Sequence, residues 1–258
     1  MPIIHTHDDL GHEIRQGSAS WMALRCGRPT ASRFSSIITP AKMEYSKAAH
    51  GYAAQLIGEQ ILGHPLDIDD EVANAWTERG TEMEDEARKW LELERGYDIR
   101  QVAFVTSDDG SEGGSPDGLV SEDGIVELKV RGAKAHMGCL LGLEDVASVT
   151  QVQGLLRVTG RKWIDVCGYS PKLPPVLYRV TPDPVFQKAL GECLAQFKAD
   201  MAKAKERLEA IGSARIDDNL LATLAASVRK KKTTKAADIE STVEAMYGPP
   251  KLVTPEVP

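Results

Sequence analysis

Three charged side chains lie in one stretch of the sequence where their spacing could support chemistry. Asp117 belongs to a Gly-Ser-Pro-Asp-Gly segment, and a run of Ile, Val and Leu surrounds Glu127 and Lys129 shortly after it. Such a run predicts a buried strand, in which alternate residues face the same side, so Glu127 and Lys129 share a face. A short antiparallel pair would bring the Asp117 carboxylate beside Glu127, with the Leu128 carbonyl between Glu127 and Lys129.

This cluster predicts metal-assisted hydrolysis of a phosphodiester. Two carboxylates at one strand edge repel each other unless a cation lies between them, and Mg²⁺ is the oxygen-binding cation usual beside phosphate. Lys129 would orient a water molecule or stabilise negative charge on a phosphoryl oxygen. The alternative is a salt-bridged hairpin at the surface. Charged residues within an apolar strand need partners, however, which favours the site.

The composition is that of an ordinary globular protein. The 258 residues are 42% hydrophobic and 27% charged, and no apolar run is long enough to span a membrane. The four cysteines are far apart and the chain begins without a secretory signal, so we expect reduced thiols and a cytoplasmic location. The net charge of −7 implies that any nucleic-acid site is a focused basic patch.

Helical and strand patterns alternate along the chain and predict an α/β fold with a central mixed β-sheet flanked by helices. Residues 1–17 are expected to be irregular. The expected elements are a helix from Ser18 to the break at Gly27, helices over 30–38, 45–62 and 72–95, strands over 101–106, 117–120 and 125–130, a helix over 148–159, strands over 163–169 and 176–180, and a helix over 183–211. The segment 213–258 is expected to be a C-terminal extension, partly helical near 217–228 or flexible.

Four motifs resemble a known family of nucleases. Pro116-Asp117 with Glu127-Leu-Lys129 resembles the PD-(D/E)xK motif, and three further segments resemble one branch of that superfamily, the lambda-exonuclease or YqaJ-type phage recombination exonucleases. These segments are Trp21-Met-Ala-Leu-Arg-Cys-Gly-Arg-Pro-Thr-Ala-Ser32, Gly80-Thr-Glu-Met-Glu-Asp-Glu-Ala-Arg88 and Thr150-Gln-Val-Gln153. The resemblance implies a nuclease domain over 1–212 with a restriction-endonuclease-like core, and it does not cover the tail.

The resemblance implies a role for each matching residue around the metal. The residues that would bind Mg²⁺, for which Mn²⁺ can substitute, are Asp117, Glu127, Leu128 through its carbonyl, and Glu84 as an outer carboxylate. Lys129 would orient or activate the nucleophilic water, and Gln151 would help to place that water or the scissile phosphate. Without the family, Glu84 is one of several solvated glutamates and Gln151 is a polar helix residue.

The resemblance also implies a phosphate site near the N-terminus. Arg25 and Ser32 match positions that hold a 5′-terminal phosphate in the family, and an arginine fork with a serine at a helix start suits that ligand. Arg28 and Pro29 depart from the family pattern, because the proline removes a backbone donor and the arginine adds a charge. Arg33 is a further candidate for contact with DNA. The alternative roles of these residues are helix capping and surface charge.

The activity implied is a Mg²⁺-dependent 5′-to-3′ exonuclease on double-stranded DNA ends, which releases mononucleotides and leaves a 3′ single-stranded overhang for phage-type recombination. The family also implies a trimeric ring, a phage single-strand annealing protein as partner, and a bacterial host cell. Two alternatives stay open: a structure-specific or end-directed endonuclease, and a catalytically inactive DNA-binding module. Further candidates to contact DNA are Lys134, His136, Arg157, Arg161, Lys162 and the basic run Arg229–Lys232.

Overall fold

The computed structural model describes residues 1–66 and 70–213, without the side chains of 70–82 and 211–213. The expected helix near 217–228 and the basic run Arg229–Lys232 lie outside these residues. The chain divides into two compact units, Met1–Lys203 and Ala204–Pro258, and the fold described here is that of the first. None of the helices in the described ranges has the length and apolarity needed to cross a membrane.

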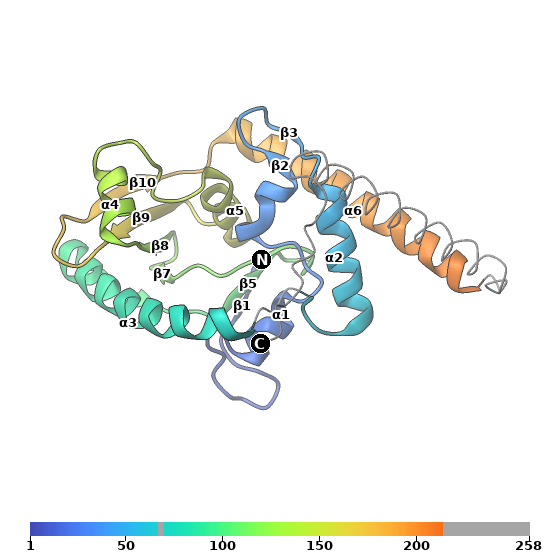
Figure 1. Ribbon diagram of the computed structural model, residues 1–258, viewed down its shortest axis with the longest axis horizontal. Helices are drawn as coiled ribbons and strands as arrows, with labels where there is room; N and C mark the ends of the chain where they lie inside the picture. The colour runs from blue at the N-terminus through green and yellow to red at the C-terminus, as the bar shows by residue number, and fades with distance from the viewer. Residues whose placement is uncertain (67–69, 214–258) are drawn as a thin grey trace, which may run out of the picture. The chain divides into compact units, whose positions relative to one another are not determined.

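A five-stranded mixed sheet carries the central residues of the predicted site. Its strand order is β10 (Val176–Val180), β9 (Trp163–Tyr169), β8 (Gly124–Val130), β7 (Gly118–Val120) and β4 (Ile99–Arg100). Strands β8 and β9 run parallel, whereas the other neighbouring pairs are antiparallel. The predicted α/β class, with a mixed sheet flanked by helices, is thereby confirmed (Figure 1).

The pairing of β7 with β8 determines where Asp117 lies. The register sets Gly118 opposite Val126, and the Asp117 amide donates a hydrogen bond to the Val126 carbonyl at 3.2 Å. The next pair in this register is Asp117 with Glu127. Residues opposite each other on antiparallel strands point to the same side, so both carboxylates leave the sheet on one face.

Helices cover both faces of this sheet. On one face, Ala87 and Leu91 of α3 (Asp70–Arg95) pack in an apolar cluster that includes Leu128. Glu127 alternates with Leu128 along β8 and therefore faces the opposite side. The Glu127 carboxylate accepts a hydrogen bond from α5 (Val149–Thr159), which places α5 on that second face. The sheet is thus sandwiched between α3 and α5, with the charged pair on the α5 side.

The N-terminal segment contains a short strand, so the expectation that residues 1–17 are irregular is wrong for Ile3–His5. β1 (Ile3–His5) pairs antiparallel with β5 (Phe104–Thr106), which in turn pairs with β6 (Gly113–Gly114). A strand of three residues is too short to show an alternating pattern in the sequence. The buried neighbour β5 supplies the hydrogen-bond partners that stabilise it.

Some of the remaining elements follow the prediction with shorter or shifted ends. The predicted ones are α1 (Ala19–Arg25), the 3-10 helix η1 (Ala31–Ser36), α2 (Ala49–Leu62) and α6 (Pro184–Ser213), whereas β2 (Ile38–Thr39), β3 (Glu44–Tyr45) and α4 (Ala133–Leu140) are additional to the prediction. Ser18 caps α1 as predicted, because its Oγ accepts a hydrogen bond from the Trp21 amide at 3.3 Å. Helix α4 was not predicted. It begins after Gly132, which has no side chain to cap it, so the usual start signal is missing.

Small residues let three backbones approach one another closely at Ala31. A Cβ added to Gly154 of α5 would lie 2.6 Å from Cδ2 of Phe34 and 3.1 Å from Cβ of Ala31. A Cβ added to Gly114 of β6 would lie 2.8 Å from Cδ2 of Leu155. These contacts set the spacing of three segments. Two of them, η1 and α5, carry predicted site residues, and the third, β6, leads to Asp117.

Gly154→Ala is expected to lower the melting temperature, although alanine is the better helix former by about 1 kcal/mol. The new methyl group would force Phe34 or the helix to move, and overpacking of this kind costs about 1–3 kcal/mol. Thermal unfolding measures the change. The matched control is Gly51→Ala in α2, where an added Cβ meets nothing within 4 Å. The control should raise the melting temperature; an equal rise for both variants would show that the junction is not tight.

Candidate active site

The carboxylates of Asp117 and Glu127 are buried side by side, which disfavours their charged forms. The Glu127 side chain is only 2% exposed, and Oδ2 of Asp117 accepts a hydrogen bond from the Leu128 amide at 2.5 Å. Burial, reinforced by the nearby carboxylates of Glu127 and Glu84, raises the pKa of Asp117 well above its ordinary value. Burial also raises the pKa of Glu127, against the opposing effect of Lys129. Such a pair favours a bound cation.

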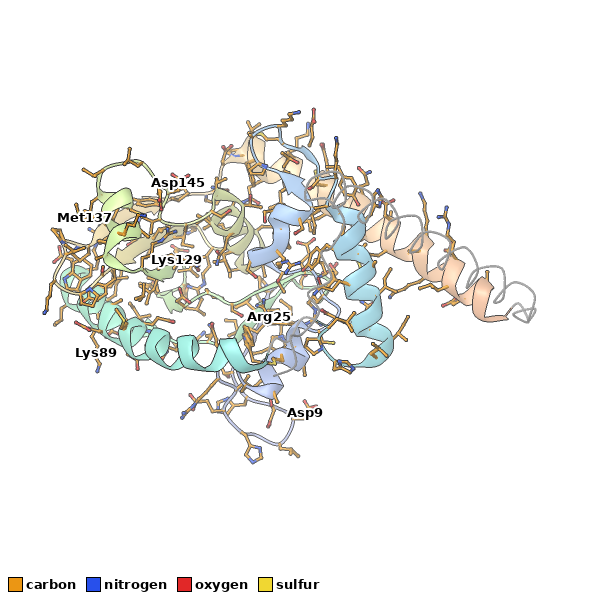
Figure 2. The ribbon with its side chains drawn as sticks, viewed as in Figure 1. Asp9, Arg25, Lys89, Lys129, Met137 and Asp145 are labelled. Carbon is orange, nitrogen blue, oxygen red and sulfur yellow. The ribbon has the colours of Figure 1, made fainter. Side chains whose placement is uncertain are left out.

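Lys129 and Gln151 both contact the same oxygen of Glu127. Nζ of Lys129 lies 2.6 Å from Oε1, and Nε2 of Gln151 donates to Oε1 at 2.5 Å. The other oxygen, Oε2, is buried and has no hydrogen-bond partner within the described part of the chain. The Lys129 side chain is 30% exposed, and its position is labelled in Figure 2. One Glu127 oxygen is therefore held by the protein, and the other is available to a ligand.

Glu84 approaches this cluster from α3. Its Oε1 accepts a hydrogen bond from Nη2 of Arg88 at 3.4 Å, and its side chain is 35% exposed. Burial raises the pKa of Glu84, while Arg88 and Lys129 act in the opposite direction and Asp85 adds to the rise. Arg88, to which the sequence assigned no role, also donates to Asp85 at 2.5 Å. Arg88, whose side chain is nearly buried, thus orients the carboxylates of Glu84 and Asp85.

The donor set fits a hard divalent cation. All the groups are oxygen ligands, burial raises the pKa of each of the three carboxyls, and Oε2 of Glu127 has no partner among the described residues. As the side chains lie, no group of three or more His, Cys, Asp or Glu among the described residues is arranged to hold a metal ion. One oxygen of each carboxylate already has a partner: Lys129 and Gln151 contact Oε1 of Glu127, Arg88 contacts Oε1 of Glu84, and the Leu128 amide contacts Oδ2 of Asp117. A cation would compete with these contacts.

The N-terminal arginines surround a separate pocket of about 340 Å³. Arg25 from α1, Arg28 from the following turn, and Ser32 and Arg33 from η1 all line it. The structure therefore brings together the four residues that the sequence proposed for a 5′-phosphate or DNA contact. A pocket lined by three guanidinium groups and the Ser32 hydroxyl is suited to bind an anion.

Arg25 and Trp21 connect this pocket to the carboxylate cluster. The Arg25 guanidinium lies 4.3 Å from the centre of the Trp21 ring, and its Nη2 donates to Oγ of Ser32 at 3.3 Å. Burial lowers the pKa of Arg25, which indicates a group partly removed from water. The Trp21 indole donates in turn to Oγ of Ser115 at 2.8 Å. Ser115 lies two residues before Asp117, so Trp21 contacts Arg25 of the pocket and the segment that leads to Asp117.

The other two arginines are engaged in packing as well. Arg28 donates to the Leu24 carbonyl, and its guanidinium lies 5.9 Å from the centre of the Phe104 ring. Arg33 donates to Oε1 of Gln55 at 3.3 Å. Each of these two arginines retains further N–H donors that a bound anion could use, because a guanidinium group carries five N–H bonds.

Glu59 is a pocket residue that the sequence did not reveal. Its side chain is buried, and it accepts hydrogen bonds from the Gly27 amide at 2.8 Å and from Nε2 of Gln55 at 2.9 Å. It also acts on Arg25, where it opposes the fall in pKa that burial causes. Nothing in the local sequence distinguishes it from a solvated helix glutamate, since its burial depends on packing between α2 and the turn after α1.

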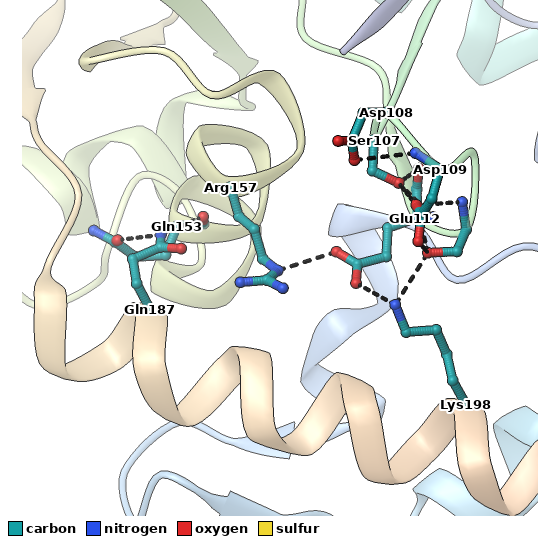
Figure 3. Close-up of polar contacts among 9 residues, drawn as sticks. Ser107, Asp108, Asp109, Glu112, Gln153, Arg157, Gln187 and Lys198 are labelled. Atoms are coloured by element: carbon teal, nitrogen blue, oxygen red, sulfur yellow. Dashed lines mark hydrogen bonds and ion pairs between the residues drawn. The ribbon is translucent and has the colours of Figure 1, made fainter. Parts of the chain in front are cut away.

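Three of the residues expected to line a DNA channel make internal contacts instead. Arg157 donates to Oε2 of Glu112 at 3.0 Å, and Nζ of Lys198 contacts the other oxygen of this nearly buried carboxylate (Figure 3). His136 is fully buried with Nε2 2.8 Å from the Pro174 carbonyl. The buried Glu112 carboxylate and the buried His136 ring require such partners, so these contacts stabilise the fold.

Arg161 is likewise structural. Its Nη1 donates to the carbonyls of Ser121 and Gly124 at 2.8 Å each, which closes the turn between β7 and β8. Lys134 and Lys162 are exposed, and Lys162 pairs with Asp123 at 3.0 Å. Arg157 is also exposed, but its guanidinium group is paired with Glu112.

A family profile described as YqaJ-like viral recombinase domain matches residues 20–162. The chain belongs to this family. The match covers all four motifs from which the resemblance was inferred, so that inference is confirmed. A search of curated proteins found no match.

Solved structures of exonucleases share the fold. LHK-Exo in complex with dAMP matches with a TM-score of 0.65 at 27% identity, over 76% of this chain and 98% of that one. Another structure of LHK-Exo, an alkaline exonuclease from Laribacter hongkongensis, matches with a TM-score of 0.60 at 26% identity, over 75% and 100% of the two chains. A phage-related exonuclease from Haemophilus somnus 129PT, at 12% identity and a TM-score of 0.55 over 70% and 96%, shares the fold alone. Family and neighbours together indicate a nuclease of the phage exonuclease type.

Proposed function

We propose that the chain is a Mg²⁺-dependent 5′-to-3′ exonuclease that degrades the 5′-phosphorylated strand of double-stranded DNA to mononucleotides and leaves a 3′ overhang. The observation that carries the proposal is the contact of Trp21 with both Arg25 and Ser115. Through Ser115, the Trp21 side chain links the arginine-lined pocket to the segment that carries Asp117, which supports a phosphate site near the carboxylates. A site that holds a terminal phosphate next to a hydrolytic site confines cleavage to the end of a strand.

The side chains divide the work of hydrolysis. Asp117, Glu127 and Glu84 would hold Mg²⁺, which when bound polarises the phosphate and lowers the pKa of a coordinated water. Lys129 is already oriented by Glu127 and would stabilise negative charge on a phosphoryl oxygen. Gln151 fixes the Glu127 carboxylate.

The relative LHK-Exo supports the product class, because one of its structures contains dAMP, a mononucleotide. The remaining parts of the proposal rest on the family. They are a trimeric ring that encloses the DNA, a phage single-strand annealing protein that loads on the overhang, Mn²⁺ as a substitute for Mg²⁺, and action in the cytoplasm of a bacterium that carries the phage or prophage.

Digestion of a linear duplex with one 5′-phosphorylated and one 5′-hydroxyl end tests the proposal. The two strands carry different fluorophores, a covalently closed circle is run alongside, and each reaction is repeated in EDTA. We expect Mg²⁺-dependent loss of the phosphorylated strand and an untouched circle. Cutting of the circle would replace the exonuclease by an endonuclease, and binding without cutting in Mg²⁺ or Mn²⁺ would indicate an inactive DNA-binding module.

Arg25→Ala is expected to abolish the preference for a 5′-phosphate over a 5′-hydroxyl end. Loss of a hydrogen bond to a charged group costs about 1.5–3 kcal/mol, so the rate on phosphorylated ends should fall roughly 10- to 100-fold. Initial rates on the two ends measure the preference. The control is Arg15→Ala, an exposed arginine outside the pocket. An unchanged preference in Arg25→Ala would move the phosphate site elsewhere.

A further inference from the structure

We propose that Arg131 is a positioning residue for hydrolysis, which acts through the segment 144–146 on Gln151. The proposal rests on the proposed function of the carboxylate cluster and names a residue outside the four motifs. Arg131 follows β8 directly and lies two residues beyond Lys129. Its position at the end of the strand places it between the reacting groups and the loop that leads into α5.

The Arg131 guanidinium ties this segment to the end of β8. Nη2 donates to the Val146 carbonyl at 2.6 Å and to the Asp145 carbonyl at 3.2 Å, while Nη1 lies 3.6 Å from a carboxylate oxygen of Glu144. Within the described part of the chain, these are all the hydrogen bonds and ion pairs of the Arg131 side chain. The bonds to two successive carbonyls fix the path of the backbone, which a single point charge cannot do.

The segment 144–146 lies against the sheet at the level of Lys129. Val146 is 3% exposed, and its Cγ1 would lie 3.0 Å from a Cβ added to Gly168. Gly168 is the register partner of Lys129 in the parallel β8–β9 pair, and register partners point to the same face. Lys129 and Val146 therefore share a face of the sheet, and Figure 2 shows Lys129 and Asp145 in the same region.

Only a short connection separates the segment 144–146 from Gln151. Two residues, Ala147 and Ser148, lie between Val146 and the first residue of α5, and Gln151 is in the first turn of that helix. Ala147 is buried, so the connection has little room to absorb a shift. A displaced segment 144–146 would move Gln151 away from Oε1 of Glu127, where the present distance is 2.5 Å. Displacements of about 1 Å at a reacting centre can cost up to roughly 100-fold in rate.

Arg131 also has an electrostatic effect, which can be separated from its positioning of the segment 144–146. Its positive charge lies close enough to Lys129 to act on it electrostatically. Arg131→Lys keeps this charge but lacks the planar guanidinium group, which reaches the Asp145 and Val146 carbonyls through Nη2 and Glu144 through Nη1, whereas Arg131→Met removes both the charge and these contacts. If position rather than charge is the role of Arg131, the two variants should lose similar activity.

The experiment is a double-mutant cycle between Arg131 and Gln151. kcat and KM on a 5′-phosphorylated linear duplex in Mg²⁺ are measured for the wild type, Arg131→Met, Arg131→Lys, Gln151→Ala and the double variant Arg131→Met with Gln151→Ala. We expect Arg131→Met and Arg131→Lys to lower kcat about 10-fold or more with KM changed less than about 3-fold. The double variant should be no slower than Gln151→Ala alone, because Arg131 acts through Gln151.

The matched control is Arg161→Met, which removes an arginine that also binds backbone carbonyls, those of Val120, Ser121 and Gly124, but at the turn where β8 begins. Its kcat should stay near that of the wild type. Additive losses in the Arg131–Gln151 cycle, an Arg131→Lys as active as the wild type, or a kcat loss in Arg161→Met equal to that in Arg131→Met would each overturn the proposal. An inactive wild-type protein would instead refute the proposed nuclease function, so the two failures are distinguishable.

Discussion

Asp117→Asn is expected to abolish DNA cleavage and, without divalent cations, to raise the melting temperature. The carboxyl is desolvated and faces Glu127 and Glu84, so its pKa in the folded protein lies above that in the unfolded chain. An acid with this shift destabilises the fold increasingly as the pH rises above its ordinary pKa. Asparagine removes the charge, and its side-chain oxygen can still accept the hydrogen bond from the Leu128 amide.

The activity and the stability of this variant should therefore change in opposite directions. Cleavage should fall at least about 1000-fold, because the cation loses a ligand that no other residue replaces. A gain of about 1 kcal/mol corresponds to a rise of roughly 2–4 °C for a chain of this size. Mg²⁺ should raise the melting temperature of the wild type and leave that of the variant nearly unchanged. Thermal unfolding in EDTA and in Mg²⁺, beside a cleavage assay, measures all three effects.

Asp165→Asn is the matched control, because this carboxylate is also buried but has good partners. It accepts hydrogen bonds from Nε of Arg179 at 2.7 Å and from the Tyr97 hydroxyl at 2.7 Å, on the face of the sheet away from Glu127. Its loss should lower the melting temperature and leave cleavage intact. If Asp117→Asn instead lowered the melting temperature or cut DNA at the wild-type rate, the carboxylate cluster would not be the metal site.

The parts of the site that the sequence predicts are those that one hairpin brings together. Asp117, Glu127 and Lys129 lie on two consecutive strands, and the apolar run with its intervening turn is enough to place them side by side. The long helix α3 is predicted for a similar reason, because a charged, alanine-containing stretch ends at Gly96, which has a φ of +65°. In both cases the determining contacts are local.

The parts that the sequence does not predict depend on contacts between distant segments. The hydrogen bond from Trp21 to Ser115 joins residues 94 positions apart, and that from Gln151 to Glu127 joins residues 24 apart. Neither contact has a local signal, because each depends on how helices pack on the sheet. Family resemblance supplied candidate roles for Arg25 and Gln151 but no contacts.

Short elements and buried polar groups escaped prediction for a related reason. Strand β1 and helix α4 are too short or too weakly capped to show a period, and each depends on contacts with another element, β1 on its pairing with β5 and α4 on its packing against β9. From the sequence, Arg157 and His136 are candidates for a basic surface. In the fold, Arg157 is paired with Glu112 and His136 is buried. A charge on a linear sequence does not reveal whether its partner is DNA or a carboxylate such as that of Glu112.

Lys129→Met is expected to lower the rate of cleavage about 100- to 1000-fold while leaving DNA affinity nearly unchanged. The ammonium group is held 2.6 Å from Oε1 of Glu127 and is partly exposed, so it lies beside the carboxylates yet within reach of a bound phosphate. A group that stabilises charge only as the bond breaks contributes to kcat and not to binding. Methionine preserves the apolar stem, so the fold should be retained.

Single-turnover cleavage in Mg²⁺ and equilibrium DNA binding in Ca²⁺ separate these two quantities. Lys162→Met is the matched control, since this exposed lysine pairs with Asp123 on the far side of the β7–β8 turn and should affect neither quantity by more than about 2-fold. Lys129→Arg should recover part of the rate, because it restores the charge with a different geometry. If Lys129→Met weakened binding as much as it slowed cleavage, Lys129 would be a DNA-binding residue, and the charge that stabilises the reacting phosphate would have to come from another group, of which Arg131 is the nearest in sequence.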